Sequence, residues 1–313
     1  MKRDFSVVIP TYNGSKTLPL VLERLRSQEQ TETLTWEVIV VDNNSTDDTA
    51  TIVKALQVQW PSQVPLKYCF EPRQGISYAR QRGVAEAQGT FVGFLDDDNL
   101  PDSNWVAAAY AFGQNYPMAG AYGGRIRGRF EVPPPPDFKR ARAFLVIRNY
   151  TDYPRRFDPS TLQLPAGAGL VVRRQAWLTS MPDQLVRVNR GGNDYEISLH
   201  LHNAGWEIWY TPSLQIEHYI KAERLERAYL IRLAYRYGLC TSELRLITAR
   251  PWQMPWVLSK NFVGSLRRLL WHVVKHRQQV MTNLDLACEL AHCWGSVLSP
   301  LYYCTRFVVR KWN

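Results

Sequence analysis

A short apolar run that ends in three aspartates constrains the fold of this chain more than any other stretch. Residues 91–99 read Phe-Val-Gly-Phe-Leu-Asp-Asp-Asp-Asn, and the apolar half predicts a buried strand of a parallel sheet. The carboxylates of Asp96, Asp97 and Asp98 repel one another unless something compensates their charge. Mg²⁺ or Mn²⁺ can do so, because these cations prefer hard oxygen ligands and bridge carboxylates to substrate phosphates. The alternative is a solvated acidic turn before a helix that starts near Asp102.

Strands and helices are expected to alternate in the first hundred residues. Apolar runs predict strands at 5–9, 36–41, 66–70 and 91–95, and helical spacing or a capping residue predicts helices near 18–25, 46–56 and 76–87. This alternation is typical of βαβ units and a mostly parallel sheet. Such sheets bind ligands in the crevice outside the carboxyl ends of their strands, which is where the three aspartates stand.

The pattern continues beyond the aspartates. Expected elements are a helix at 102–116, an extended stretch at 119–130, a strand at 165–172, a helix from Asn193 or Asp194 to Ala204, and strands at 205–210 and 214–218. Residues 131–164 contain four consecutive prolines and no clear period, which favours a surface excursion or a loop on the acceptor side.

The turn after the first strand excludes a dinucleotide-binding loop of the dehydrogenase type. It reads Pro10-Thr-Tyr-Asn-Gly14, whereas such a loop needs three spaced glycines for close backbone approach to a pyrophosphate. Asp42 nevertheless ends the second strand, where an acid that contacts a nucleoside belongs in such folds. The sheet is therefore expected to bind a nucleotide whose phosphates are held elsewhere, at the aspartate run.

Length, cysteine content and the start of the chain narrow the class further. The 313 residues suit one large α/β domain with an appendage, or two small domains. The five cysteines form no C-x-x-C pair, which argues against a disulfide framework or a zinc knuckle and favours a reducing compartment. The first residues lead directly into a strand that is too short for the apolar segment of a signal peptide.

Charge divides the chain in two. Residues 1–220 hold 23 Lys and Arg against 23 Asp and Glu, whereas residues 221–313 hold 15 against 5. We therefore expect a nucleotide-binding and catalytic domain over 1–220 and a basic helical region over 221–313, with an anionic partner for the latter.

Tryptophans and apolar helical stripes indicate which kind of anionic partner the basic region binds. Residues 225–232 and 266–273 show helical spacing with basic residues on the other side, and five tryptophans are spread through the region. Such helices are typical of segments that lie in an anionic membrane surface. The longest uncharged run, 290–305, is too short for a confident span. An ordinary helical subdomain is the alternative, and nucleic acid is not expected because no aromatic RNA-binding signature or zinc finger is present.

Four motifs in register carry a resemblance to a known family. They are residues 6–13 (Ser-Val-Val-Ile-Pro-Thr-Tyr-Asn), 41–47 (Val-Asp-Asn-Asn-Ser-Thr-Asp), 74–80 with Gln-Gly and Ala-Arg, and 95–99 (Leu-Asp-Asp-Asp-Asn). In order and spacing they resemble the family 2 glycosyltransferases of GT-A fold, over roughly residues 5–220. The neighbourhood Leu-Pro-x-x-Asn-Trp at 100–105 and the basic region resemble bacterial members that serve hormogonium-type exopolysaccharide synthesis.

The resemblance implies a donor site. Pro10, Thr11 and Tyr12 would shape the base pocket, and Asp42 would accept a hydrogen bond from the imide N–H of uracil or a similar base. Arg80 would pair with the anionic part of the nucleotide, because its planar fork suits phosphate. A helix-capping role for Asp42 and a surface ion pair for Arg80 are the structural alternatives.

It also implies a metal site. Asp96 and Asp97 would face the ribose and the nearby sugar, while Asp98, with Asp96 and His218, would hold Mn²⁺ or Mg²⁺ on the diphosphate. A purely structural histidine is the alternative for His218.

A second chemical centre lies at Arg190-Gly-Gly-Asn-Asp-Tyr-Glu196. Inverting sugar transfer needs a carboxylate that takes the proton of the acceptor hydroxyl. Asp194 matches the second acid of the family's Glu-Asp pair and is the expected general base, with Glu196 as the fallback and a helix cap as the alternative role. Asn193 stands where Glu is usual, which puts acceptor orientation in doubt and raises the case for a non-catalytic member.

The expected activity follows from these sites. The chain would move a sugar from a nucleotide-diphosphate donor, a UDP-sugar, onto a polysaccharide or lipid-linked acceptor. This inverting, metal-dependent reaction would take place in the cytoplasm, on the inner face of the cell membrane. One rival is a regulator that binds nucleotide sugars without catalysis. Another is a nucleotidyltransferase, which normally needs a glycine-rich basic loop after the first strand; the turn at 10–14 has one glycine and no basic residue.

Overall fold

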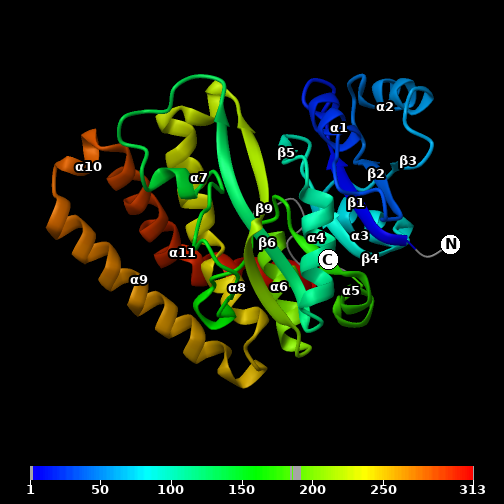
Figure 1. Cartoon of the computed structure of the whole chain (residues 1–313). Coiled ribbons are helices and arrows are strands. Elements are labelled where there is room, and N and C mark those ends of the chain that lie inside the picture. The colour runs from blue at the N-terminus through cyan, green and yellow to red at the C-terminus, as the bar shows by residue number, and fades with distance from the viewer. Residues whose placement is uncertain (1–2, 184, 186–191, 313) are drawn as a thin grey trace. The chain divides into compact units, whose positions relative to one another are not determined.

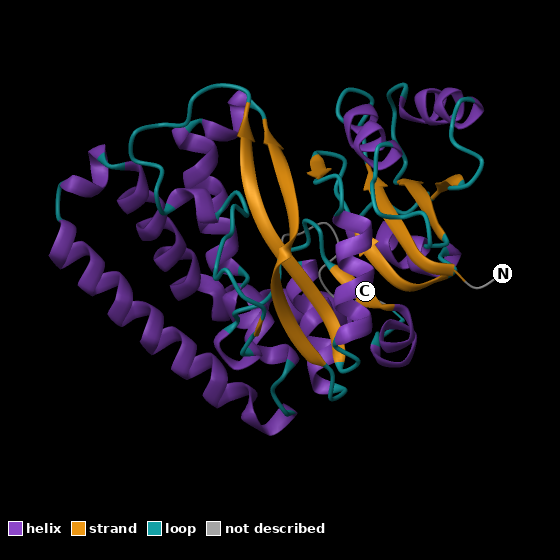
Figure 2. Ribbon diagram, in the orientation of Figure 1, coloured by secondary structure: helices purple, strands orange, loops and turns teal. Residues whose placement is uncertain are grey.

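The chain folds into two compact units. The computed structural model describes residues 3–183, 185 and 192–312. The first unit comprises residues up to 129 and 148–219, and the second comprises 130–147 and the chain from 220 onward. Part of the excursion expected at 131–164, namely 131–147, thus belongs to the second unit. The expected α/β class, with a helical C-terminal region, is confirmed (Figures 1 and 2).

The N-terminal part of the chain forms four parallel strands, which make up one half of the sheet. They are β1 (Arg3–Thr11), β2 (Trp36–Asp42), β3 (Leu66–Phe70) and β4 (Gly89–Phe94), in the order β3-β2-β1-β4. The connecting helices are α1 (Leu18–Arg26), α2 (Thr49–Val58) and α3 (Ile76–Glu86). All seven residues of β2 are buried, as expected for a strand covered on both faces.

The carboxyl ends of these strands meet at one edge. Thr11 pairs with Asp42, and Asp42 pairs with Phe70. The loop that follows Phe94 carries the three aspartates to the same edge, because β4 runs parallel to β1. Side chains from separate motifs therefore converge where open α/β sheets bind ligands.

Antiparallel strands complete the sheet. They are β5 (Asn99–Pro101), β6 (Ala119–Phe130), β7 (Arg155–Arg156), β8 (Val171–Arg173) and β9 (Glu207–Ile220), arranged as β4-β8-β6-β9-β5 with β7 also on β9. Between them lie the helices α4 (Trp105–Asn115), α5 (Arg174–Ser180) and α6 (Asn193–Asn203). The long strand β9 returns to the aspartate loop, where His218 pairs with Asn99.

Two strand predictions were wrong in extent. The strands expected at 205–210 and 214–218 are one continuous strand, β9. Pro212 lies between the part of β9 that pairs with β7 and the part that pairs with β5, so its missing N–H falls between these two ladders. The strand expected at 165–172 is limited to Val171–Arg173, and the small residues before it form a loop.

The second unit is helical. Its helices are α7 (Arg227–Leu239), α8 (Thr241–Ile247), α9 (Met254–His276), α10 (Gln279–Thr282) and α11 (Leu284–Trp312), with short 3₁₀ turns at 141–143, 222–225 and 251–253. Helix α11 packs against both α7 and α9. Leu145, Ile220, Leu230 and Cys288 contribute to its buried core. Among the helices of the described residues, none has the length and apolar character needed to cross a membrane.

Candidate donor and acceptor site

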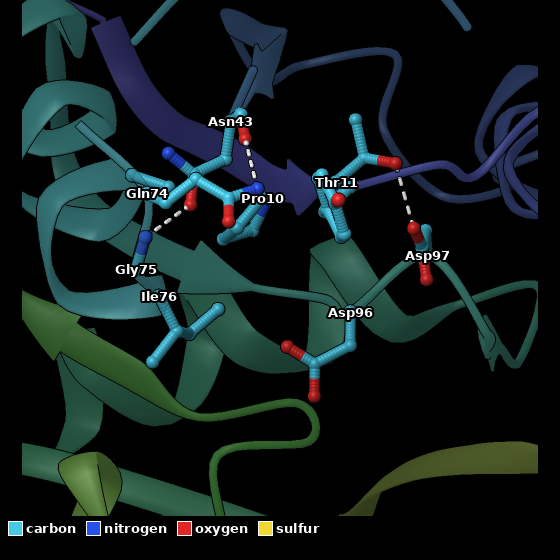
Figure 3. Close-up of a pocket in the computed structure, with 10 residues that line it drawn as sticks. Pro10, Thr11, Asn43, Gln74, Gly75, Ile76, Asp96 and Asp97 are labelled. Atoms are coloured by element: carbon cyan, nitrogen blue, oxygen red, sulfur yellow. Dashed lines mark hydrogen bonds between the residues drawn. The ribbon is translucent and has the colours of Figure 1, made fainter. Parts of the chain in front are cut away.

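A pocket of about 430 Å³ opens at the carboxyl edge of the parallel strands. Its walls come from the end of β1, the residue after β2, the start of α3 and the aspartate loop (Figure 3). The lining residues are Pro10, Thr11, Tyr12, Asn43, Gln74, Gly75, Ile76, Ala79, Asp96 and Asp97. The volume suits a small ligand such as a nucleotide.

Thr11 and Asp97 join two strand ends across the pocket wall. The buried Thr11 hydroxyl donates to Asp97 Oδ2 at 2.6 Å (Figure 3). Burial, together with the negative charges of Asp98 and Asp96, raises the pKa of Asp97 to about 7, although the Thr11 hydrogen bond opposes the shift. The site therefore concentrates more negative charge than its surroundings compensate, which favours binding of a cation.

Arg80 compensates part of this charge. Its guanidinium Nη2 lies 3.4 Å from Asp96 Oδ1. Burial raises the pKa of Asp96, while Arg80 lowers it and Asp98 adds to the rise. The Arg80 side chain is only 4% exposed, so the alternative of a surface ion pair is excluded. Arg80 is a buried part of the site.

Asp98 and His218 lie side by side because β5 pairs with β9. Asp98 Oδ2 is 3.3 Å from His218 Nε2, and Asp98 Oδ1 accepts from Asn99 Nδ2 at 2.8 Å. The side-chain oxygen Oδ1 of Asn99 also accepts a hydrogen bond from the backbone N–H of Asp96 at 3.1 Å. The buried Asn99 thereby fixes the orientation of the loop that carries both acids.

This pair fits a divalent cation that is shared with a ligand. Carboxylate and imidazole are both donors that Mn²⁺ accepts. In the part of the chain that the structure describes, no three acidic, histidine or cysteine side chains are grouped as a complete metal cage. Cations of this class commonly use one or two protein carboxylates and take their other ligands from substrate phosphates and water. The donor set thus suits a metal held jointly by the protein and a diphosphate.

Asn193 links Arg80 to the start of helix α6. Its side-chain oxygen accepts from Arg80 Nη1 at 3.0 Å, and its side-chain nitrogen donates to Ser77 Oγ at 2.8 Å. Asn193 is buried. Asn193 therefore has a defined structural role, as an anchor between α3 and α6.

Asp194 follows directly and is oriented by the loop before β8. The Gly167 N–H donates to Asp194 Oδ2 at 2.7 Å. Asp194 is close enough to Asp96 for its charge to help raise the pKa of that acid. The fallback base, Glu196, is completely buried with His200 beside it at 3.9 Å. Of the two acids, the partly exposed Asp194 is the better placed to reach a substrate.

The Asp42 carboxylate accepts hydrogen bonds from two neighbouring protein groups. Its Oδ2 accepts from the Tyr68 hydroxyl at 2.7 Å, and its Oδ1 accepts from the Ser45 N–H at 2.9 Å. Burial and this contact with Asp42 raise the pKa of Tyr68 to about 12. Asp42 is not among the residues that line the pocket. A nucleotide base could still donate to Asp42, through carboxylate lone pairs that the Tyr68 hydroxyl and the Ser45 N–H do not occupy.

Asn43, the next residue, lines the pocket and was not singled out from the sequence. Its N–H donates to the Thr11 carbonyl at 2.8 Å, and its side-chain oxygen accepts from the Gly75 N–H at 2.7 Å (Figure 3). Its side-chain nitrogen donates to the Arg73 carbonyl at 2.7 Å. Asn43 therefore joins the end of β1 to the loop before α3. Its position inside the motif at 41–47 was the only available signal.

The remaining predicted residues are also at this edge. Pro10 is buried in the pocket wall, and Tyr12 is exposed at its rim. Gln74, Gly75 and Ala79 were quoted as parts of a motif but not as site residues, and all three line the pocket together with Ile76, which was not singled out.

Comparison with known proteins identifies the family. Residues 6–177, more than half of the chain, match the model of Glycosyl transferase family 2. The GalNAc(5)-diNAcBac-PP-undecaprenol beta-1,3-glucosyltransferase of Campylobacter jejuni is 34% identical over 96 residues, which is 30% of this chain and 29% of that protein. The succinoglycan biosynthesis protein ExoM of Rhizobium meliloti is 24% identical over 244 residues, or 76% and 75% of the two chains. The match to the first of these relatives spans less than a third of its length.

Solved structures share the fold. The mannosyltransferase PcManGT from Pyrobaculum calidifontis, in complex with GDP-Man and Mn²⁺, superposes with a TM-score of 0.60 at 18% identity and covers 96% of this chain and 87% of its own. Staphylococcus aureus TarS 1-349 in complex with UDP-GlcNAc gives 0.53 at 16% identity, covering 92% and 90%. These likenesses establish the GT-A fold. With the family match over its N-terminal half, the chain belongs to glycosyltransferase family 2.

Proposed function

We propose that this chain transfers a sugar, with inversion, from a nucleotide-diphosphate donor to a hydroxyl of a polysaccharide or lipid-linked acceptor. The observation that carries the proposal is the bridge made by Arg80, which contacts Asp96 on one side and Asn193 on the other. This bridge brings the acidic edge of the donor pocket beside Asp194. Donor binding and deprotonation of an acceptor can therefore occur at one place.

The pocket supplies the donor contacts. A nucleoside would lie between Tyr12 and the Asn43–Gly75 wall, with Pro10 and Thr11 beneath it. Arg80 would attract the diphosphate, because a buried guanidinium pairs strongly with phosphate oxygens. We favour uridine as the base, since the fold neighbour TarS is described with UDP-GlcNAc, and Asp42 retains its proposed role at the imide N–H.

A divalent cation, Mn²⁺ or Mg²⁺, would neutralise charge on the departing diphosphate. Asp98 and His218 would hold it, with Asp96 on the same loop, while Asp97 would face the ribose. PcManGT is described with Mn²⁺ and a nucleotide sugar, which supports this choice.

Asp194 would act as the general base. The acceptor oxygen bonds to the anomeric carbon, the bond from that carbon to the diphosphate breaks, and the hydroxyl proton passes to the Asp194 carboxylate. The Gly167 N–H orients this carboxylate before the acceptor arrives. Attack from the face opposite the diphosphate inverts the anomeric configuration.

The acceptor is proposed from the relatives. One is described as acting on an undecaprenol-linked glycan and another as a succinoglycan biosynthesis protein. A role in exopolysaccharide synthesis agrees with the second of these names. The hormogonium type is proposed from the sequence resemblance alone, and a place at the cytoplasmic face of a membrane is proposed from the basic C-terminal region.

Calorimetric binding of UDP, GDP and dTDP tests the donor site. We expect one nucleotide, UDP, to bind with Mn²⁺, and both EDTA and Asp98→Ala to abolish that binding. Folded protein that binds no nucleotide under any condition would contradict the transferase assignment.

Turnover of the donor tests the base. Asp194→Asn is expected to keep UDP binding and to lower turnover by about 10²- to 10⁴-fold, the usual range for a general base. Asp183→Asn, an exposed acid elsewhere in the first unit, is the matched control and should leave turnover unchanged. Unchanged turnover in Asp194→Asn, or none in the unmodified protein with any donor, would favour the regulator.

A further inference from the structure

Helix α9 (Met254–His276) buries mostly polar side chains and exposes several large apolar ones. Its buried positions are Asn261, Ser265, Leu269 and His272. Three of these four are polar, although a helix that packs in water normally turns an apolar stripe toward the core. The buried face of α9 packs on α11 and α8 of the same unit.

Hydrogen bonds satisfy the buried polar side chains. Asn261 Nδ2 donates to Ser242 Oγ at 2.7 Å and to Ser299 Oγ at 3.0 Å. His272 Nε2 lies 3.0 Å from the Leu286 carbonyl oxygen. Polar interhelical contacts of this kind hold helices together where the hydrophobic effect does not drive their packing.

The outward face is apolar. Its members lie at helical spacing along one side and have exposed fractions of 57% to 68%; they are Trp256, Val263, Leu270, Trp271 and Val274. At 1.5 Å per residue, this stripe is about 27 Å long. Scattered exposed apolar residues need no explanation, but five large ones gathered along one side of a helix mark an interaction surface.

Basic residues accompany the stripe. Lys260 and Arg267 lie within it, and the Lys260 ammonium stands 4.7 Å from the centre of the Trp256 ring. Between Glu243 and Asp285 the chain holds seven Lys and Arg and no acid. An anionic lipid surface matches both properties, because lysine and tryptophan place polar groups at the headgroups while their apolar parts enter the acyl boundary.

We infer that the outward face of α9 lies in the surface of an anionic membrane, with the helix parallel to it. A second copy of the chain is a poorer occupant, because a symmetric interface would bring Lys260 and Arg267 of both copies together with no acid from α9 to offset them. Lipid needs no such acid. The inference identifies the contacting surface and is independent of which sugar or acceptor the enzyme uses.

Vesicle co-sedimentation of the full chain tests the inference. We expect binding to phosphatidylcholine vesicles that contain phosphatidylglycerol, weaker binding to phosphatidylcholine alone, and weakening by salt. The triple variant Trp256→Ser, Val263→Ser, Val274→Ser should lower vesicle binding at least tenfold. Val58→Ser is the control, since Val58 is 86% exposed on α2 of the other unit, and it should bind as the unmodified protein does.

Two further measurements keep the outcome interpretable. UDP binding should be unchanged in the triple variant, which separates a failure of lipid contact from a failure of the donor site or of folding. Lys260→Gln with Arg267→Gln should reduce the salt dependence of vesicle binding. Equal binding by the triple variant and the unmodified chain, or no vesicle binding at low salt, overturns the inference. Sedimentation equilibrium that shows a dimer lost in the triple variant, without lipid binding, assigns the face to a second copy instead.

Discussion

Asn193 illustrates how a single amide can organise a site without entering its chemistry. An amide both accepts and donates, so one side chain satisfies Arg80 and Ser77 at once. A carboxylate at this position could not donate to Ser77, although the serine hydroxyl could turn to donate to it. Asn at this position, where the resemblance predicts Glu, therefore makes a neutral contact with Arg80 in place of a charged one and leaves Asp194 in place.

Gly167 lacks a side chain where Arg80 and Asp194 approach the backbone closely. A Cβ at this position would lie 2.6 Å from Arg80 Nη2 and 3.3 Å from Asp194 Cβ. We therefore expect Gly167→Ala to displace the guanidinium or the loop, and to lower turnover by about 10²-fold, because misplacement of about 1 Å costs that much in rate.

Gly264→Ala is the matched control for this change. Gly264 lies in α9 with no atom within 4 Å of an added Cβ, so alanine should leave turnover unaltered and raise helix stability by about 0.5–1 kcal/mol. Donor turnover and thermal unfolding of both variants provide the measurement. If Gly167→Ala retains full turnover, the close approach has no role in positioning Asp194.

At the scale of elements, strand β9 determines the metal side of the site. It pairs with β5 so that His218 faces Asp98. We expect His218→Gln, which removes a proposed metal ligand, to weaken Mn²⁺-dependent UDP binding by at least about 10- to 100-fold, because loss of even a hydrogen-bonding partner of a ligand costs this much. Calorimetry at fixed UDP with varied Mn²⁺ measures this.

His202→Gln is the control for this variant. His202 is a partly exposed histidine on α6 that does not line the pocket. The control variant should bind UDP and Mn²⁺ as the unmodified chain does. Equal metal dependence of His218→Gln and the unmodified chain would show that His218 is structural.

Sequence patterns predicted elements whose ends are marked by local turn residues, and missed features that depend on distant partners. The limits of β3 and β6 were predicted correctly, because prolines and other turn residues bound these stretches, although neither strand is fully buried. The site role of Asn43 rests on contacts with the Thr11 carbonyl and the Gly75 N–H, and backbone groups leave no trace in side-chain patterns. In α9, the periodic spacing of apolar residues predicts a helix. The same spacing results whether those residues face a core or face outward, so it does not predict which side of α9 is buried.

At the scale of the whole molecule, charge follows the division into units. The second unit, 130–147 with the chain from 220, holds 18 Lys and Arg against 7 Asp and Glu, and the first holds 20 against 21. The whole basic excess therefore lies in the second unit, and the first unit, which contains the acidic pocket edge, has a small net negative charge. Such a division lets one part of the chain attract an anionic surface while the other concentrates carboxylates for a cation.

Within the first unit, Glu37 is a completely buried carboxylate that supports the sheet away from the site. Its Oε2 lies 2.7 Å from Lys67 Nζ, and its Oε1 accepts from the Ser6 hydroxyl and the Gln88 N–H, each at 2.8 Å. Burial alone would raise the pKa of Glu37, but Lys67, Gln88 and Ser6 outweigh it and hold the pKa below its ordinary value. The folded state thus binds the proton more weakly than the unfolded chain.

This depressed pKa predicts a pH-dependent contribution to stability. Glu37 stabilises the fold above the unfolded pKa of about 4.3, and this stabilisation is lost as pH falls through the folded pKa. Glu37→Gln should lower the free energy of unfolding by about 2 kcal/mol at pH 7, the typical size of a hydrogen-bonded contact to a charged group. The difference from the unmodified chain should shrink as the pH is lowered from 5 toward 3.

Urea unfolding across this pH range provides the measurement, with Glu23→Gln as control. Glu23 pairs with Arg26 on the surface of α1, where its side chain is 60% exposed, and its loss should change stability by less than about 0.5 kcal/mol at every pH. A constant difference between Glu37→Gln and the unmodified chain from pH 7 to pH 3 would mean that the lost contacts are packing contacts. A difference that vanishes at low pH would identify the buried carboxylate charge as the source of the stability.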